Sequence, residues 1–366
     1  MINPDIVYLK KMMGCAMALA RKGIGKTAPN PPVGCVIVKN GEIVGTGWHR
    51  KAGTPHAEIH ALREAGDRAR GAEVFVTLEP CSHFGRTPPC ADALVEAGVG
   101  RVYAGTIDPN PQVGGKGIER LRAAGIMVSC GLREQECRRI IAPFVKYVTT
   151  GLPLVAVKSA LTLDGRTATV SGDSKWITGE PARRHVHRLR AGHDAIMVGA
   201  DTVIADDPQL TCHMLRGGRD PVRVVVDSRL RTPLDARIFR VQSRAGVIIA
   251  TTLKDEELWS AYRGRGVEIL LCRDAGGRVD LADLLARIGA RGIQSLLVES
   301  GGKLAGALLF QRLIDRLILF YGPKLVGEGH SPFAGAGVVN MSEAIRLQEC
   351  TMRRFGDDFM VSGYLR

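Results

Sequence analysis

The sequence predicts two α/β domains joined by a short linker near residue 150. Strand and helix patterns alternate along both halves of the chain, which is typical of α/β folds. A length of 366 residues is enough for about two domains. The segment 149–153 contains Gly151 and Pro153, which commonly interrupt regular structure, and the alternation starts again after it. We therefore expect one domain over residues 1–149 and another over 150–366.

The first half is expected to open with a helix and then to alternate between strands and helices. Asn3 followed by Pro4 is typical of a helix cap with a proline in the first turn. Asn40 and Gly41 form a strong two-residue hairpin signal, and apolar runs flank them. The expected helices lie at 4–20, 56–69, 90–98, 115–124 and 133–148, and the expected strands at 33–38, 43–48, 73–78, 101–107 and 127–130.

The second half repeats this alternation. It has no G-x-G-x-x-G sequence after an early strand, so a Rossmann domain is not supported. The basic run at 183–190 is expected to be a solvated helix face. The expected strands lie at 154–161, 194–198, 222–227, 246–251, 268–271, 295–299 and 315–321, and the expected helices near 179–191, 255–263, 280–289 and 303–313.

Apolar patterning and cysteine usage predict a cytoplasmic protein without a membrane partner. No apolar run approaches the roughly 18 residues that a membrane span needs, and the N-terminus lacks the apolar segment of a secretory signal. The nine cysteines are an odd number scattered along the chain. They fit reduced cytosolic thiols better than a disulfide framework.

The net charge of +13 is spread over both halves. Such a basic surface attracts either nucleic acids or phosphorylated small molecules. Aromatic residues make up only 5% of the chain, and no stripe of mixed basic and aromatic residues is present. We therefore expect a phosphorylated small molecule as the partner and no nucleic acid.

Four residues of the first half form a pattern for metal binding and proton transfer. His56 and Glu58 lie at a predicted helix start. Cys81 follows a predicted strand, and Cys90 begins the next helix. One imidazole and two thiolates suit Zn²⁺, and three protein ligands leave the fourth position for water. A nearby carboxylate that does not bind the metal can carry the proton, as in zinc deaminases. We predict zinc at the histidine and the two cysteines, with Glu58 as the catalytic acid–base group.

These residues have two other interpretations. The first is a closed structural zinc site, for which His83 is the obvious fourth ligand. The second is that His56, Cys81 and Cys90 are ordinary helix and loop residues. The combination of all three with a carboxylate favours the catalytic site.

Longer motifs around these residues are similar to those of a known family. They are NPPVG at 30–34, HAE at 56–58, EPCSHFGRTPPC at 79–90 and DPNP at 108–111. Over nearly its whole length the sequence resembles the bifunctional deaminase/reductases of riboflavin biosynthesis. The long spacing between the two cysteines matches that family and differs from cytidine and tRNA-adenosine deaminases.

The resemblance implies a cytidine-deaminase-like, three-layer α/β/α domain followed by a dihydrofolate-reductase-like α/β domain. It implies that the first domain deaminates 2,5-diamino-6-(5-phosphoribosylamino)pyrimidin-4-one and that the second reduces the ribosyl group with NADPH. Contacts to the base and ribose phosphate are implied for Asn30, His49, His83 and Arg86. We expect a homo-oligomer, either a dimer or a tetramer.

Motifs of the second half extend the resemblance through VAVKSALTLDGR at 155–166, SKWIT at 174–178, ADDPQLT at 205–211 and VESGGKLAG at 298–306. The last motif is a strand end running into a Gly-rich helix start, which can hold a pyrophosphate but can equally be a simple turn. The resemblance implies cofactor contacts at Ala160, Trp176, Thr202, Asp206, Ser228, Gly301, Gly302, Lys303, Leu304, Ala305, Gly306 and Ala307. It implies substrate contacts at Ser174, Arg190, Leu210, His213 and Glu299.

The chain departs from the family at His213, where the resemblance leads one to expect an arginine that contacts phosphate. Either His213 or Arg216 takes that role. Lys158 and Glu299 are both candidates to assist opening of the ribose ring.

Two other functions stay open at this point. One is a nucleic-acid base deaminase with a non-catalytic accessory domain, which predicts no NADPH binding. The other is a non-catalytic zinc-stabilised binding module, which predicts a closed four-ligand site.

Overall fold

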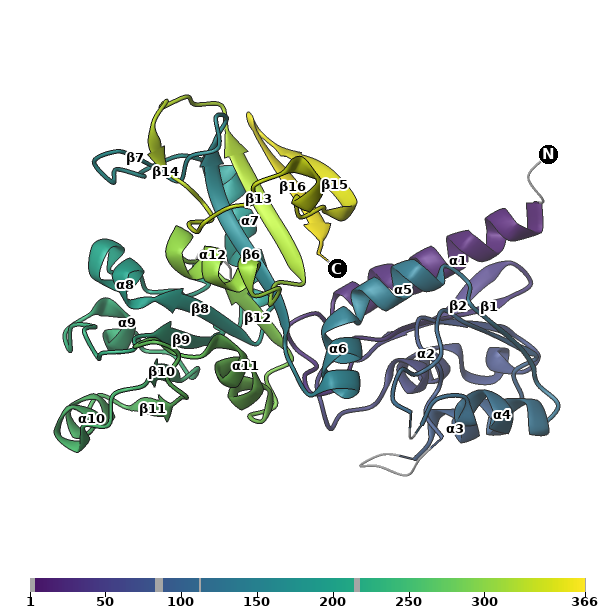
Figure 1. Ribbon diagram of the computed structural model, residues 1–366. Coiled ribbons are helices and arrows are strands. Elements are labelled where there is room, and N and C mark those ends of the chain that lie inside the picture. Colours follow the sequence, from purple (N-terminus) through teal and green to yellow (C-terminus); the bar gives the residue numbers. More distant parts are fainter. Residues whose placement is uncertain (1–3, 83–87, 112, 214–217, 366) are drawn as a thin grey trace. The chain divides into compact units, whose positions relative to one another are not determined.

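The chain forms two compact units, Met1–Gly151 and Leu152–Arg366 (Figure 1). The computed structural model describes residues 4–82, 88–111, 113–213 and 218–365. Among these residues, no helix combines the length and the apolar character needed to cross a lipid bilayer.

The first unit is a five-stranded sheet in the order β2-β1-β3-β4-β5. Strand β1 is antiparallel to both β2 and β3, whereas β3, β4 and β5 are parallel. The strands are β1 Gly34–Lys39, β2 Glu42–Trp48, β3 Glu73–Val76, β4 Arg101–Ala104 and β5 Met127–Cys130. The helices are α1 Pro4–Arg21, α2 Ala57–Ala65, the 3-10 helix η1 Gly66–Ala69, α3 Cys90–Glu96, α4 Lys116–Ala123, α5 Glu134–Ile140 and α6 Ala142–Thr150.

Helices cover both faces of this sheet and make the predicted three layers. Cys35 and Ile37 of β1 belong to a core with α2, α3 and α4, and the alternate residues Val36 and Val38 belong to a core with α1 and α5. Figure 1 shows α1 and α5 on one face of the sheet and α2, α3 and α4 on the other.

Two glycines bring α2 directly onto β2. A Cβ atom at Gly47 would lie 2.0 Å from the Ala57 carbonyl oxygen, and one at Gly45 would lie 2.2 Å from that of Ala61. No other residue permits this contact between a strand and a helix backbone. The start of α2, which carries His56 and Glu58, is thereby fixed against the sheet.

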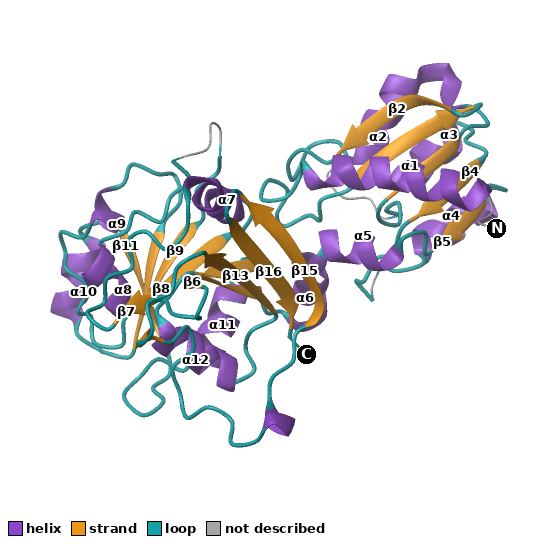
Figure 2. Ribbon diagram, turned by 90° about the horizontal axis from the view of Figure 1, so that it is seen from above, coloured by secondary structure: helices purple, strands orange, loops and turns teal. Residues whose placement is uncertain are grey.

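The second unit has a nine-stranded sheet in the order β11-β10-β9-β8-β12-β6-β13-β16-β15 (Figure 2). Neighbouring strands from β11 to β13 are parallel, and β16 and β15 are antiparallel. The strands are β6 Leu154–Thr162, β8 Ala195–Gly199, β9 Val222–Val226, β10 Val247–Thr251, β11 Val267–Leu271, β12 Ser295–Val298, β13 Arg316–Gly322, β15 Gln348–Phe355 and β16 Asp358–Tyr364, with β7 Ala168–Thr169 and β14 Gly329–His330 as a separate pair.

The main core of this unit lies between the sheet and two helices, α11 Leu281–Gly289 and α12 Gly302–Phe310. Helix α7, Glu180–Ala191, reaches the other face through Arg190, which bonds to Glu299 just after β12. The remaining helices are α8 Ala200–Asp206, α9 Arg237–Arg240, α10 Glu256–Arg263 and the 3-10 helix η2 Met341–Glu343.

The structure differs from the predicted elements in two informative places. The helix expected over 133–148 is divided at Ile141, because Pro143 fits the first turn of a new helix but not the interior of a continuous one. The antiparallel pair β15–β16 was not predicted. Gly356, whose φ of 66° suits the turn between these strands, was the sequence signal for it. The short elements β7, α8, α9, β14 and η2 were not predicted either.

Candidate active sites

The three predicted zinc ligands meet at the starts of two helices. His56 immediately precedes α2, Cys90 is the first residue of α3, and Cys81 lies in the connection after β3. The Nδ1 atom of His56 lies 3.5 Å from Cys81 Sγ and 3.3 Å from Cys90 Sγ. All three ligand atoms lie within 4.8 Å of one another.

This donor set fits a tetrahedral zinc ion. Zn–S bonds of about 2.3 Å and a Zn–N bond of about 2.0 Å place ligand atoms roughly 3.5–3.8 Å apart. The observed distances of 3.3 and 3.5 Å are close to these edges. Cys81 Sγ also accepts from the Cys90 backbone N–H at 3.3 Å, a contact that favours its thiolate form. Within the described part of the chain, no fourth histidine, cysteine or carboxylate joins this cluster; His83 lies outside that part.

Glu58 lies beside the cluster on the first turn of α2. Its side chain is 3% exposed, and its Oε2 atom has no hydrogen-bond partner among the described residues. Burial, together with the negative charge of Cys81, raises the pKa of Glu58 to about 7. An unpartnered, buried carboxylate oxygen next to three side chains that could hold a metal ion is the arrangement expected of a proton carrier.

Contacts link Asn30 through His49 to His56. The Asn30 amide Nδ2 lies 3.2 Å from His49 Nε2, and His49 Nδ1 lies 3.2 Å from the Pro55 carbonyl oxygen. The His49 and His56 rings meet edge to face at 5.1 Å. Burial lowers the pKa of His49, and a neutral ring with its proton on Nδ1 satisfies both contacts. The other two residues expected around this substrate, His83 and Arg86, lie outside the described residues.

A cavity of about 1380 Å³ opens in the second unit at the carboxyl ends of β6, β8, β9 and β12. This edge of a parallel sheet is where α/β proteins commonly bind ligands. The volume exceeds that of a typical single-ligand pocket, roughly 300–1,000 Å³. The expected contact residues that line it are Ala160, Ser174, Trp176, Arg190, Thr202, Asp206, Leu210, His213, Ser228, Glu299, Gly301, Gly302, Lys303, Leu304 and Ala307.

Two of the expected cofactor residues face away from the cavity. Ala305 is fully buried in the core beneath the sheet. A Cβ atom at Gly306 would lie 1.9 Å from the Ala334 carbonyl oxygen, so this glycine permits close packing against another segment. Ala305 faces the core and Gly306 faces the segment at Ala334, and neither lines the cavity. The start of the same helix at Gly301 does reach the cavity, where the Gly301 N–H donates to Thr202 Oγ1 at 3.3 Å.

A buried ion-pair network forms the cavity wall around Glu299. Arg190 donates from Nε and Nη2 to the two carboxylate oxygens at 2.8 and 3.0 Å, and Lys158 Nζ donates to Oε2 at 3.4 Å. Burial alone would raise the pKa of Glu299, but the two cations outweigh it and hold the pKa at about 2.

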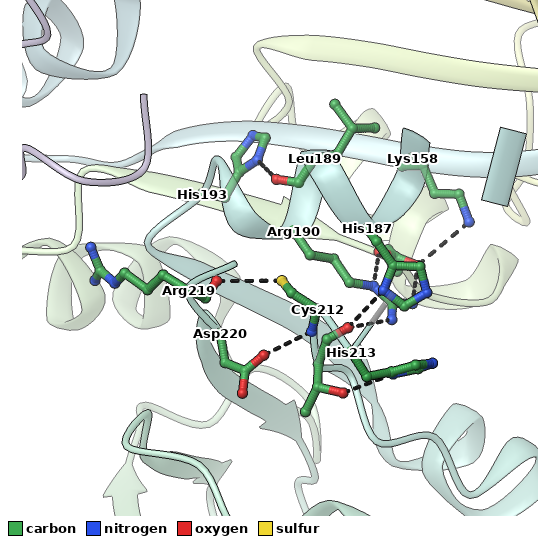
Figure 3. Close-up of polar contacts among 11 residues, drawn as sticks. Lys158, His187, Leu189, Arg190, His193, Cys212, His213, Arg219 and Asp220 are labelled. Atoms are coloured by element: carbon green, nitrogen blue, oxygen red, sulfur yellow. Dashed lines mark hydrogen bonds and ion pairs between the residues drawn. The ribbon is translucent and has the colours of Figure 1, made fainter. Parts of the chain in front are cut away.

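His187 joins this network, contrary to the expectation of a solvated helix face over 183–190. It is 7% exposed, and its Nδ1 and the Arg190 Nη1 lie 3.0 and 3.1 Å from the same Thr211 carbonyl oxygen. The His187 and His213 rings are 4.6 Å apart, and Figure 3 shows Arg190, His187 and His213 converging. Burial and Arg190 lower the pKa of His187 to about 4. Arg184 and Arg188 do remain exposed.

Sequence reasoning could have found His187 from its spacing. Residues three apart on a helix share a face, so an Arg190 that points into a site places His187 there as well.

Comparison with known proteins identifies both units. Residues 153–361, more than half of the chain, match the family described as the RibD C-terminal domain. The chain belongs to the RibD family. Residues 8–106 match the cytidine and deoxycytidylate deaminase zinc-binding region. The expected combination of a cytidine-deaminase-like domain and a reductase domain is thus confirmed, and the alternative of a non-catalytic accessory domain is wrong.

RibD proteins of several bacteria are similar to the chain over nearly its full length. The riboflavin biosynthesis protein RibD of Actinobacillus pleuropneumoniae is 44% identical over 359 residues, covering 98% of this chain and 94% of that protein. RibD of Escherichia coli is 45% identical, with coverages of 94% and 96%.

Solved structures agree with this assignment. Acinetobacter baumannii RibD is 39% identical, with a TM-score of 0.85 and 99% of each chain covered. A deaminase/reductase of Thermotoga maritima is 38% identical, with a TM-score of 0.88 and coverages of 99% and 100%. The chain is therefore a bifunctional RibD-type deaminase and reductase of riboflavin biosynthesis.

Proposed function

We propose that the first unit deaminates 2,5-diamino-6-(5-phosphoribosylamino)pyrimidin-4-one and that the second reduces the ribosyl group of the product to ribityl with NADPH. The observation that carries the first step is the cluster of His56, Cys81 and Cys90 beside the buried, unpartnered carboxylate oxygen of Glu58. The structure of the Thermotoga maritima protein, described as a diaminohydroxyphosphoribosylaminopyrimidine deaminase and 5-amino-6-(5-phosphoribosylamino)uracil reductase, supports this choice of substrate.

The residues of the first unit divide the deamination between them. His56, Cys81 and Cys90 would hold zinc, which would supply the Lewis acidity that makes water nucleophilic near neutral pH. Glu58 Oε2 accepts a proton from the attacking water and passes protons to the ring and the departing amine. The 2-amino group leaves as ammonia and a carbonyl oxygen replaces it. Asn30 and His49 hold the base, and His83 and Arg86 are proposed to contact the ribose phosphate.

The second unit positions a nicotinamide cofactor and the deaminated product in one cavity. We assign the cofactor to the residues at the ends of β6, β8, β9 and β12, where the first turn of α12 offers backbone N–H groups to its phosphates. We assign the product to Ser174, Arg190, Leu210, His213 and Glu299. Hydride transfer is chemistry of the cofactor, so the protein aligns its ring with the sugar C1′. Of the two candidates, Lys158 and Glu299, we assign assistance in opening the ribose ring to Lys158, because the Glu299 carboxylate is already bonded to Arg190 and Lys158. We further propose that the chain works in the cytoplasm as a dimer or tetramer.

A coupled assay tests the two-site proposal. Ammonia release from the diaminopyrimidine phosphate is measured first, and NADPH oxidation is followed with and without that step. We expect NADPH oxidation only after deamination, and oxidation of NADPH with the undeaminated substrate would contradict the order proposed.

Removal of zinc should separate the two activities. Dialysis against a chelator is expected to abolish ammonia release, because the three ligands serve only the first unit. Reduction of supplied deaminated product should continue at its original rate. Restoration of ammonia release by zinc is the control, and equal loss of both activities would argue against independent sites.

Replacement of His213 by arginine tests the phosphate contact. Arginine stays charged and can bind phosphate through two parallel N–H groups, whereas a histidine ring offers no such paired donors. We expect KM for the deaminated product to fall by about tenfold, or roughly 1.4 kcal/mol, with NADPH affinity unchanged. A change in NADPH affinity alone would place His213 at the cofactor.

A further inference from the structure

Glu79, two residues before the zinc ligand Cys81, organises the start of α4 with its side chain. The residue is 5% exposed. Its Oε2 accepts hydrogen bonds from the backbone N–H groups of Asp108 and Gly115 at 3.0 and 2.9 Å. Its Oε1 accepts from those of Gly117 and Ile118 at 2.8 and 3.2 Å. One carboxylate therefore satisfies four backbone donors from the 108–118 segment.

The segment 79–81 is held from both sides. On the α4 side, a Cβ atom at Gly117 would lie 1.9 Å from the Pro80 carbonyl oxygen, so the two backbones touch. On the α3 side, the Cys81 carbonyl oxygen accepts from Ala91 N–H at 3.1 Å, and Cys81 Sγ accepts from Cys90 N–H at 3.3 Å. The position of Cys81 is thus set by contacts with two helices.

We propose that Glu79 is a positioning residue for the zinc site, acting through Pro80 on the direction of Cys81. The inference rests on zinc binding at His56, Cys81 and Cys90 as proposed above. A ligand held in place before the metal arrives binds with a smaller loss of conformational entropy. Residues that orient metal ligands typically contribute 10- to 100-fold to metal affinity. If Glu79 stabilised only α4, its loss would lower the stability of the unit without a specific effect on zinc.

The test compares Glu79→Gln with Glu73→Gln in the full chain. Glutamine offers one acceptor oxygen, and its NH₂ group faces two N–H donors, so two of the four hydrogen bonds are lost. Glu73, at the opposite end of β3, also bonds through its carboxylate, accepting from the Tyr8 and Tyr103 hydroxyls at 2.8 and 3.4 Å. Zinc affinity is measured by competition with a chromogenic chelator, and Tm is measured on the zinc-free proteins. We expect Glu79→Gln to weaken zinc binding by about 10- to 100-fold and Glu73→Gln to leave it close to the wild-type value.

A second variant displaces the same segment through its backbone contact with α4. In Gly117→Ala the new Cβ atom would lie 1.9 Å from the Pro80 carbonyl oxygen and 3.2 Å from Glu79 Oε1, so the variant displaces the same segment while the Glu79 carboxylate stays in the chain. It should also weaken zinc binding, and it serves as the test if Glu79→Gln does not fold. Cobalt(II) bound in place of zinc gives a second readout, since its visible spectrum reports ligand geometry. If the wild type binds zinc and both variants keep its affinity while Tm falls, Glu79 serves only α4 and the inference is overturned. If the wild type itself binds no zinc at these residues, the proposed deaminase site is wrong.

Discussion

Replacing Glu58 with glutamine is expected to lower ammonia release by about 10²–10⁴-fold. The carboxylate oxygen without a partner is the group that would carry the proton, and an amide cannot accept and return it. Zinc should stay bound, because Glu58 is not a ligand of the cluster. Reduction of supplied deaminated product should be unchanged, because that cavity lies in the other unit.

The matched control is Glu64→Gln on the same helix. Glu64 is exposed, and its carboxylate accepts from the Thr46 N–H at 2.9 Å. This variant should deaminate at nearly the wild-type rate. Near-normal ammonia release from Glu58→Gln, with zinc content verified, would remove Glu58 from the mechanism.

Glu299→Gln is expected to have the largest effect on the second unit. The substitution leaves Arg190 and Lys158, whose side chains are 16% and 15% exposed, without their buried counter-charge. Removing one partner of a buried ion pair typically costs about 3–5 kcal/mol of unfolding free energy. Reduction should be strongly impaired, while ammonia release continues. Denaturant unfolding and separate assays of the two activities measure these effects.

The same residue gives the second unit a predictable response to acid. The pKa of Glu299 is lowered from 4.5 to about 2 in the folded protein. A depressed carboxyl pKa stabilises the folded state above the unfolded pKa, by about 3 kcal/mol here. This contribution is lost as pH falls from about 4.5 toward 2. Glu299→Gln should therefore lose less stability than the wild type over that interval, and parallel losses would contradict the assigned ion pair.

Local sequence was sufficient to predict that His56, Cys81 and Cys90 cluster, because each of the three residues lies at a boundary between elements that its own neighbouring residues predict. His56 precedes a helix, Cys90 begins one, and Cys81 follows a strand. The resemblance supplied the cavity residues of the second unit. It could not show which side of α12 each residue faces, and the cofactor contacts at Ala305 and Gly306 stay predictions.

Contacts between distant segments account for what the sequence did not reveal. His187 is buried because Thr211 and His213 pack against it, and its charged neighbours Arg184 and Arg188 suggested water instead. Four donors that are 29 to 39 positions away along the chain define the role of Glu79. Neither spacing nor composition encodes such partners.

The glycines of β2 set a condition for moving this metal centre into another protein. Copying His56, Glu58, Cys81 and Cys90 onto a different scaffold would reproduce the side chains but not the close approach of their helix to the sheet. Side chains at positions equivalent to Gly45 and Gly47 would hold that helix away from the sheet. A design would therefore need glycines at these two positions of the strand as well as the ligand residues at the helix starts.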